Sequence, residues 1–533
     1  MSNSQGRAIA RNAGSVMLLI LISRLLGFIR ERAIAEVFGL TWETDAFRAA
    51  FNIPDLMYFL LVGGAISSAF IPVFSEQLAR GQEKEAWRMA SAFISLVTAA
   101  LLTLTVLGVA ASPWLAPLVA PGFDDAQLAF LVVLMRVMFP AVLFTALAGV
   151  CMGVHNSYQS FVAPLLGPIM YNVSITLGAY ILGPRMGIMG MALGTVAGAV
   201  INFLMQVPFV AGKVRRFPWS LDLKHPGLHK VLRLMGPTIL GLSIVQLNTI
   251  ILTALASTLD AGSITALNLA NRLVQLPLGV FGMGMSMVTF PVLARQAALG
   301  DVQQFRATLS SGLRAVLFIT VPSAAGLIAL REPIVRLLFE VGEFGPDDTA
   351  MTAYALVFFS LGVFAVSCVQ LLTRAFYSLQ DTVTPVKIGA LTVATNTLTA
   401  AALLRWTSLA HGGLALAHSL ASVVQMTTQL LLLRRKLGGR LDGSKLLGTL
   451  ARAAAAALVM MPAAAGAAKA VGARVNVATL AGRLAETGAG IAAGVAVYAL
   501  AAAALRMEEL RMVWSLLQRR LAFLTRRRNG RSA

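Results

Sequence analysis

Charged side chains are scarce in this sequence. They make up 12% of its 533 residues, whereas hydrophobic residues make up 57%. A soluble globular protein carries about 25% charged residues, and the mean hydropathy here is +0.78. This composition excludes a soluble globular domain and predicts an all-α polytopic membrane protein, because a helix satisfies its own backbone hydrogen bonds inside a bilayer.

Cysteine and histidine are also nearly absent. The two cysteines, Cys151 and Cys368, lie far apart in apolar stretches, and the five histidines form no cluster with them. Neither a disulfide framework nor a zinc or redox motif is indicated. We interpret both cysteines as packing residues and predict no bound cofactor.

Acidic residues number 23 against 43 basic ones, which gives a net charge of +20. Much of the basic charge lies around Arg80, Arg216 and Arg435 and in the tail from Arg519 to Arg531. The positive-inside rule places such loops in the cytoplasm, where anionic lipid headgroups attract them. We therefore predict no nucleic-acid partner, contacts with anionic membrane lipids, and both termini in the cytoplasm.

Apolar stretches of about 20 residues or more recur along the chain, and each is long enough to cross about 30 Å of hydrocarbon. We predict about fourteen transmembrane helices from them. Their approximate ranges are 12–38, 47–79, 86–116, 127–154, 161–183, 187–211, 231–258, 263–297, 306–331, 350–378, 383–405, 412–434, 446–471 and 480–505.

The two halves of the chain resemble each other at an offset of about 220 residues. Ile71-Pro72-Val73 matches Phe290-Pro291-Val292, and Gln159 matches Gln380. Six helices return the chain to its starting side, so the repeats are predicted to be parallel, about a pseudo-twofold axis along the membrane normal. The predicted divisions are an N-lobe at 1–211, an interfacial linker at 212–230, a C-lobe at 231–437, two further helices at 438–505 and a basic tail at 506–533.

Five arginines lie in or against apolar stretches: Arg24, Arg30, Arg136, Arg272 and Arg374. An arginine at mid-membrane costs roughly 2.5–3.5 kcal/mol, so it normally faces a polar cavity, a partner or an anionic ligand. Guanidinium groups match phosphate oxygens well. We predict that Arg24, Arg30 and Arg272 bind a phosphorylated ligand, and we interpret Arg136 and Arg374 as structural.

Arg24 and Arg30 are six residues apart, which is about 120° around a regular helix. They share a face only if the helix bends, and Gly27 between them permits a bend. We expect a bent first helix that turns both guanidinium groups toward the interface between the lobes.

The second helix of each repeat carries further polar residues, Arg48 and Asn52 in the first repeat and Arg272 and Gln275 in the second. All four are predicted to border one substrate cavity. For Arg48, which lies near the outer membrane edge, snorkelling to water is an equal alternative. Asp45 is predicted to act as a substrate contact, counter-ion or gate, and a helix cap is the alternative.

Proline and glycine interrupt these two helices at corresponding places, which is typical of hinges for alternating access. The residues predicted as hinges or gates are Gly27, Pro54, Gly63, Gly64, Pro277 and Gly282.

Several short segments carry a resemblance to a known family: Ser23-Arg-Leu-Leu-Gly-Phe-Ile-Arg30, Thr44-Asp-Ala-Phe47, Ala69-Phe-Ile-Pro72, Ala120-Pro-Gly-Phe123, Met235-Gly-Pro-Thr238, Asn271-Arg-Leu273 and Phe376-Tyr-Ser-Leu-Gln-Asp381. With the arginines and the repeat, the chain resembles the MurJ (MviN) lipid II flippases of the multidrug/oligosaccharidyl-lipid/polysaccharide exporter superfamily. The resemblance implies a V-shaped pair of six-helix lobes with two added helices. It also implies transport of the undecaprenyl-pyrophosphate-linked peptidoglycan precursor from the inner to the outer leaflet of the bacterial cytoplasmic membrane, with Arg24, Arg30, Asp45 and Arg272 at positions that matter.

Two positions depart from that pattern, since Tyr58 and Gly63 stand where many relatives carry an arginine and a glutamate. The departure leaves open another polyprenyl-linked oligosaccharide as substrate, or a scaffold without transport. A drug–cation antiporter would require carboxylates in a membrane interior that is cationic here. A membrane enzyme using Asp124-Asp125 and Asp347-Asp348 as metal ligands is the other alternative, but these pairs begin predicted helices, where carboxylates favour the helix dipole.

The driving force stays open between the membrane potential, worth about 2.3 kcal/mol per charge per 100 mV, and a monovalent ion. We expect a monomer, because one chain carries both repeats and a complete cavity. Cell wall synthesis enzymes are the further partners that we expect.

Overall fold

A computed structural model describes residues 3–60, 66–214, 220–439 and 442–510. These ranges are helical and contain no strand, which confirms the predicted all-α class. Ten helices among them are long and apolar enough to cross a membrane, and a pair bent by 46°, Pro346–Ser360 with Val363–Ser378, makes an eleventh if it is one span. The total of fourteen stays a prediction.

The first compact unit contains the residues up to Thr265 together with Phe339–Asp348. Buried aromatic side chains, including Phe70, Phe93 and Phe139, form much of its core. Its helical elements, in which η marks a π-helical segment, are α1 (Asn3–Phe38), α2 (Trp42–Ala50), α3 (Asn52–Tyr58), η2 (Ile66–Phe70), α4 (Ile71–Ala79), α5 (Glu83–Val119), α6 (Asp125–Ser157), α7 (Val162–Leu177), η3 (Gly178–Leu182), α8 (Gly183–Met186), α9 (Ile188–Val214) and α10 (Pro226–Ala256).

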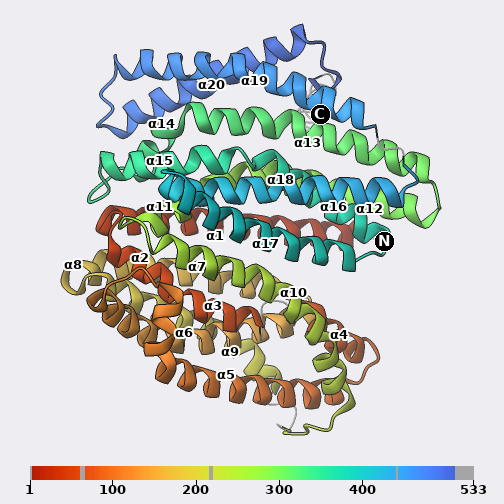
Figure 1. Ribbon diagram of the computed structural model, residues 1–533. Coiled ribbons are helices and arrows are strands. Elements are labelled where there is room, and N and C mark those ends of the chain that lie inside the picture. The colour runs from red at the N-terminus through yellow and green to blue at the C-terminus, as the bar shows by residue number, and fades with distance from the viewer. Residues whose placement is uncertain (1–2, 61–65, 215–219, 440–441, 511–533) are drawn as a thin grey trace, which may run out of the picture. The chain divides into compact units, whose positions relative to one another are not determined.

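The second compact unit contains Ala266–Leu338 and the residues from Thr349 onward. In it α19 and α20 lie side by side, and α19 also packs against α13 (Figure 1). Its elements are α11 (Ser263–Pro277), whose first turn belongs to the first unit, η4 (Leu278–Met283), α12 (Gly284–Ala298), α13 (Val302–Ala329), α14 (Arg331–Phe339), α15 (Pro346–Ser360), α16 (Val363–Ser378), α17 (Val383–Trp406), α18 (Ala410–Lys436), α19 (Gly443–Gly472) and α20 (Leu480–Ala504).

Most predicted helices are found within a few residues of their expected ends. The paired aspartates begin helices as expected: Asp124 caps α6 in a reciprocal capping box with Gln127, and Asp347 and Asp348 lie in the first turn of α15. The range 47–79 is divided among α2, α3, η2 and α4 rather than forming one helix. The short helix α14 was not predicted.

The two repeats share unusual backbone conformations. Gln159 and Gln380 have positive φ angles of 58° and 59°, and Gly81 and Gly300 have φ angles of 73° and 68°. Each glutamine lies just after the end of a helix. The amide of the next residue donates back to a carbonyl in the last turn of that helix; in the first repeat, Ser160 N donates to His155 O at 2.9 Å. Because non-glycine residues rarely adopt this conformation, its recurrence in the two glutamines, 221 residues apart, supports the internal repeat, and the two glycines are 219 residues apart.

The turn after Gln380 is fixed by an ion pair. Asp381 accepts hydrogen bonds from Lys436 Nζ at 2.6 Å, Thr384 N at 3.0 Å and Thr384 Oγ1 at 2.8 Å. The hydrogen bond from Lys436, with those from Thr384, lowers the pKa of Asp381 to about 2. This carboxylate thereby ties the start of α17 to the end of α18.

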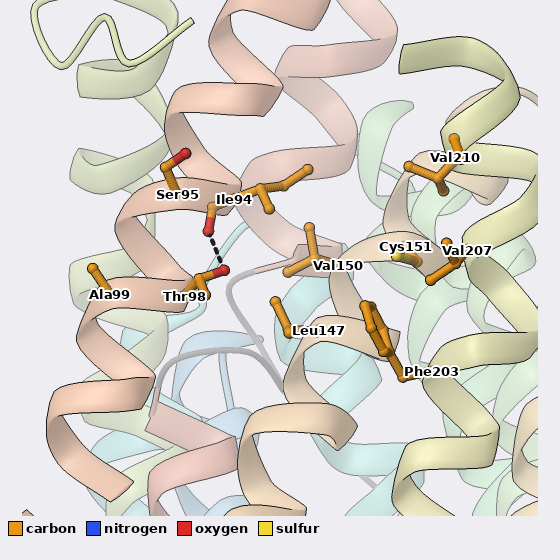
Figure 2. A pocket seen from close by; sticks show the side chains of 11 residues that line it. Ile94, Ser95, Thr98, Ala99, Leu147, Val150, Cys151, Phe203, Val207 and Val210 are labelled. Carbon is orange, nitrogen blue, oxygen red and sulfur yellow. Dashed lines mark hydrogen bonds between the residues drawn. The ribbon is translucent and has the colours of Figure 1, made fainter. Parts of the chain in front are cut away.

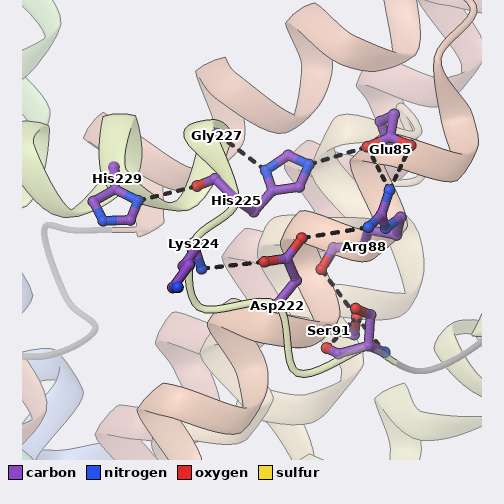
Figure 3. A network of polar contacts seen from close by, with 9 residues as sticks. Glu85, Arg88, Ser91, Asp222, Lys224, His225, Gly227 and His229 are labelled. Carbon is purple, nitrogen blue, oxygen red and sulfur yellow. Dashed lines mark hydrogen bonds and ion pairs between the residues drawn. The ribbon is translucent and has the colours of Figure 1, made fainter.

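The segment between the repeats is docked on α5. Ser91 Oγ donates to Ser220 O at 3.0 Å and accepts from Ser220 N at 3.1 Å. Arg88 pairs with Asp222 at 3.3 Å (Figure 3). These contacts hold the described part of the predicted linker against the first three turns of α5.

The end of this segment begins α10. The buried imidazole of His225 accepts a hydrogen bond at Nδ1 from Gly227 N at 3.0 Å, and its Nε2 lies 3.2 Å from a Glu85 oxygen (Figure 3). Helix α10 then packs against α3, α4, α5 and η2. Helix α10 is the first helix of the second sequence repeat, but it belongs to the first compact unit. The predicted lobe boundaries stay predictions.

Candidate functional site

A buried carboxylate joins two arginines in the first unit. Arg30 donates to Glu31 Oε1 at 2.6 Å and to Asn172 Oδ1 at 3.0 Å, and Arg48 donates to Glu31 Oε2 at 2.8 Å. The Glu31 side chain is only 1% exposed, and those of Arg30 and Arg48 are 16% and 12% exposed. We call these four residues the charge cluster; α1, α2 and α7 bring them together.

The charge cluster has more hydrogen-bond donors than its partners use. Two guanidinium groups share the Glu31 carboxylate, and Asp55 is a second carboxylate that interacts electrostatically with Arg30. The buried Arg48 Nε has no hydrogen-bond partner among the described residues, and neither has Nδ2 of Asn52, which lies four residues further along. Buried donors are normally satisfied. An anion with several oxygens would supply the missing acceptors.

Arg24 and Arg30 do not share contacts in this structure. Helix α1 runs without interruption through Gly27, so no helix break turns the two side chains to one face. Arg24 is exposed and makes no polar contact with the part of the chain that the structure describes, whereas Arg30 is directed to α7. A Cβ on Gly27 would lie 3.8 Å from Asn172 Oδ1, so this glycine lies beside the charge cluster.

Arg272 and Gln275 lie on α11 in the second unit. Both are exposed, and their spacing of three residues places them on one face of the helix. Their predicted contact with the ligand that Arg24 and Arg30 bind stays a prediction. Arg374, interpreted as structural, lies with its guanidinium 5.6 Å from the centre of the Phe290 ring, a cation–π contact.

Asp45 caps the start of α11. It is 3% exposed. Its oxygens accept hydrogen bonds from Gly262 N and Thr265 N, both at 2.8 Å, and from Thr265 Oγ1 at 2.7 Å. Amides at a helix start lack intrahelical acceptors and favour negative charge. The capped helix is α11 and not the helix that carries Asp45, and the predicted role as substrate contact, counter-ion or gate stays a prediction.

Three of the predicted hinges lie at or beside irregular helix, whereas Gly27 lies within the uninterrupted α1. Pro54 lies in α3, directly after the break between α2 and α3; Pro277 is the last residue of α11, and Gly282 lies in η4. A Cβ on Gly282 would lie 3.3 Å from Ser367 Cα, so η4 packs closely on α16. Gly63 and Gly64 lie outside the described residues. Whether these places move stays a prediction.

An apolar groove of about 570 Å³ lies in the second unit. Its walls come from α11, η4, α13, α14, α19 and α20, and they include Leu276, Phe281, Phe318, Met460 and Ile491. Small residues on α20 allow the helices to approach, since a Cβ on Gly490 would lie 3.1 Å from Ala464 O. A groove of this kind suits a hydrocarbon chain.

Sequence reasoning missed Glu31 and Asn172. The signal for Glu31 was present, because a carboxylate inside a predicted transmembrane range is itself a functional indication. Asn172 gave no such signal, since one amide in an apolar helix is a common packing residue.

The comparisons with known proteins decide the family. A family model described as "Lipid II flippase MurJ" matches residues 34–481. The chain belongs to the MurJ family of lipid II flippases. A MurJ relative from Buchnera aphidicola subsp. Acyrthosiphon pisum, named as a probable lipid II flippase, is 34% identical over 432 residues, covering 79% of this chain and 82% of that protein. The MurJ of Burkholderia cenocepacia is 33% identical over 378 residues, covering 69% and 73%.

Solved structures agree at the level of the fold. The structure titled "Lipid II flippase MurJ, inward closed conformation" has a TM-score of 0.75 at 23% identity and covers 92% of this chain and 99% of its own. An inward-facing multidrug resistance MATE transporter of the MOP superfamily has a TM-score of 0.66 at 16% identity, covering 81% and 99%. The predicted MurJ resemblance is confirmed, whereas the structures show only a shared fold and the superfamily stays a prediction. The family match begins after Arg24 and Arg30, so the role of Arg30 rests on the charge cluster and that of Arg24 stays a prediction.

Proposed function

We propose that this chain moves lipid II, the undecaprenyl-pyrophosphate-linked peptidoglycan precursor, from the inner to the outer leaflet of the cytoplasmic membrane by alternating access. Membership of the MurJ family supports the substrate class. The observation that carries the proposal within this chain is the charge cluster, in which two buried arginines share one carboxylate, together with the unused buried donors Arg48 Nε and Asn52 Nδ2.

The pyrophosphate of the substrate would bind at this cluster. Phosphate oxygens accept paired hydrogen bonds from guanidinium groups, and Arg48 Nε and Asn52 Nδ2 have no other acceptor in the described chain. Glu31 keeps Arg30 and Arg48 in place when no phosphate is bound. Arg24, exposed on the same helix, and Arg272 and Gln275, exposed on α11, are proposed to join the contacts during transport.

The lipid tail of the substrate would lie in a groove between helices, and the apolar groove of the second unit has walls of a kind that suit hydrocarbon. Burying hydrocarbon is favourable by about 0.8 kcal/mol per methylene relative to water; inside a bilayer the groove guides the chain instead of holding it tightly. Pro277 lines this groove, so a change at the end of α11 would alter its wall.

The remaining parts of the proposal rest on the amino-acid sequence. We infer a transporter that performs no chemical conversion, has both termini in the cytoplasm, acts as a monomer and takes its direction from the membrane potential or a monovalent ion. Anionic lipids and cell wall synthesis enzymes are its proposed further partners.

The test is complementation in cells depleted of their own lipid II flippase. Growth should be rescued, and lipid II should become accessible at the outer surface. Arg30→Ala and Arg48→Ala should lose both effects at normal membrane expression. Arg80→Ala, which removes an exposed pair with Glu76, should keep both. Normal expression of the unaltered chain without rescue would redirect the proposal to another polyprenyl-linked glycan.

A further inference from the structure

A second apolar groove lies in the first unit, between three candidate membrane spans. It has a volume of about 600 Å³. Figure 2 shows Ser95 and Ala99 of α5 on one side, Phe203 and Val207 of α9 on the other, and α6 between them. Both α5 and α9 pack against α6, and the groove is the space left between them.

The walls of the groove are mostly apolar. The Thr98 hydroxyl in its wall donates to Ile94 O at 2.7 Å, so its hydrogen is already used within α5. The α6 wall consists of Leu147, Val150 and Cys151. A void beside such side chains forfeits their dispersion contacts, and in a bilayer the available filler is a hydrocarbon chain.

Polar side chains at the ends of the same three helices form a rim above the groove, which we define as Glu83, Trp87, Tyr158 and Lys213. Trp87 Nε1 donates to the Tyr158 hydroxyl at 3.0 Å, and that hydroxyl donates to Glu83 Oε1 at 2.5 Å. Lys213 Nζ lies 4.4 Å from the Tyr158 ring centre and 4.0 Å from Glu83 Oε1. Trp and Tyr are typical of the membrane–water interface.

The depth of the groove below the rim matches a phospholipid. Trp87 and Ile94 are seven positions apart on α5, and so are Tyr158 and Cys151 on α6, whereas Lys213 is two positions from Ala211 on α9. At 1.5 Å per helical residue the groove begins about 10 Å from the rim on α5 and α6 and about 3 Å from it on α9. A lipid whose headgroup lay on the rim would thus place an acyl chain in the groove.

The charges of the rim select the headgroup. Lys213 and Glu83 are both partly exposed, at 29% and 41% of their side chains, and so can be reached from the interface. An anionic headgroup would gain Lys213 but be repelled by Glu83, and a polyprenyl pyrophosphate would be repelled more. A zwitterionic headgroup satisfies both, with its phosphate on Lys213 and its ammonium on Glu83.

We propose that the groove between α5, α6 and α9, with its rim, is a binding site for an aminophospholipid such as phosphatidylethanolamine. This site is separate from the charge cluster and does not depend on the proposed flipping function.

Photo-cross-linking of the full chain in vesicles tests the site. The probe is phosphatidylethanolamine with a diazirine on its acyl chain, compared with phosphatidylglycerol of identical chains. The peptides that contain Leu147–Cys151 and Phe203–Ala211 should be labelled severalfold more by the first lipid. Ala99→Phe fills the groove and should lower this labelling severalfold, and Ala211→Phe fills it from α9 if the first variant folds poorly. Ala110→Phe, an exposed alanine on α5 outside the groove, should leave labelling unchanged.

The rim variants test the headgroup. Lys213→Ala and Glu83→Gln should each reduce the preference for phosphatidylethanolamine over phosphatidylglycerol, while Lys84→Ala should not. Equal labelling by the two lipids, or labelling that survives both groove-filling variants, would show ordinary boundary lipid and overturn the proposal. Stronger labelling by a photoreactive polyprenyl pyrophosphate would overturn it too, by making the groove a substrate site.

Discussion

Replacing Glu31 by glutamine tests the charge cluster directly. The Glu31 side chain is 1% exposed and accepts from Arg30 at 2.6 Å and from Arg48 at 2.8 Å. Glutamine keeps the shape but removes the carboxylate that both arginines share, so the net charge of the four cluster residues rises from +1 to +2. Breaking a buried ion pair from one side costs about 3–5 kcal/mol. We predict a loss of stability of that order, seen as a lower apparent unfolding temperature in detergent.

A second substitution separates this cause from a packing defect. Glu31→Gln with Arg48→Gln returns the net charge to +1, so part of the lost stability should be recovered. Charge-assisted hydrogen bonds are worth about 1.5–3 kcal/mol, and a double-mutant cycle should give a coupling of that size. Arg80→Gln, in an exposed pair with Glu76, should change stability by less than about 1 kcal/mol. Additive effects of the two cluster substitutions would refute the reasoning.

Three further outcomes follow from single contacts. Asp45→Asn should weaken the cap of α11 and cost about 1 kcal/mol, measured by thermal unfolding; a loss of transport at unchanged stability would instead favour a substrate contact. Because the pKa of Asp381 is lowered to about 2 from an unfolded value of about 3.9, its stabilisation is present above pH 4 and lost as the pH falls toward 2. Asp381→Asn should flatten that part of an acid titration of stability, and an unchanged titration would contradict the role of the Lys436 pair. Gly342→Ala should destabilise by about 1–2 kcal/mol, since its φ is +64° and a Cβ would lie 2.2 Å from a carbonyl of α1. Gly345→Ala, where a Cβ meets nothing within 4 Å, is the control in the same thermal assay, and equal effects of the two would count against the clash.

The class, the helix ranges and the repeat were predictable because they depend on local patterns. Long apolar runs specify spans, and matched turns such as those at Gln159 and Gln380 recur with the same positive φ angle. The interruptions around Pro54 and Pro277 were signalled by proline and glycine. The π-helical form of η2 and η4 was not, since the hydrogen-bond register of a helix is not visible in its side-chain pattern.

The contacts of the site were less predictable because they join distant segments. Asp45 binds a backbone amide 217 residues away, so its role as a cap of α11 depends on how α2 packs. Arg48 looked able to snorkel to water, yet it is 12% exposed and paired with Glu31. The pattern located the charged residues, and the packing of α1, α2 and α7 decided which of them meet.

Reconstitution tests the central claim most directly. Vesicles that contain only this protein and fluorescent lipid II should show transfer of the label between leaflets, measured by its accessibility to a membrane-impermeant quencher. We predict transfer by the unaltered chain, a strong reduction in Arg30→Ala and Arg48→Ala, and activity near that of the unaltered chain in Arg80→Ala. Transfer that is unaffected by both cluster variants, or no transfer by the well-folded unaltered chain, would contradict the account.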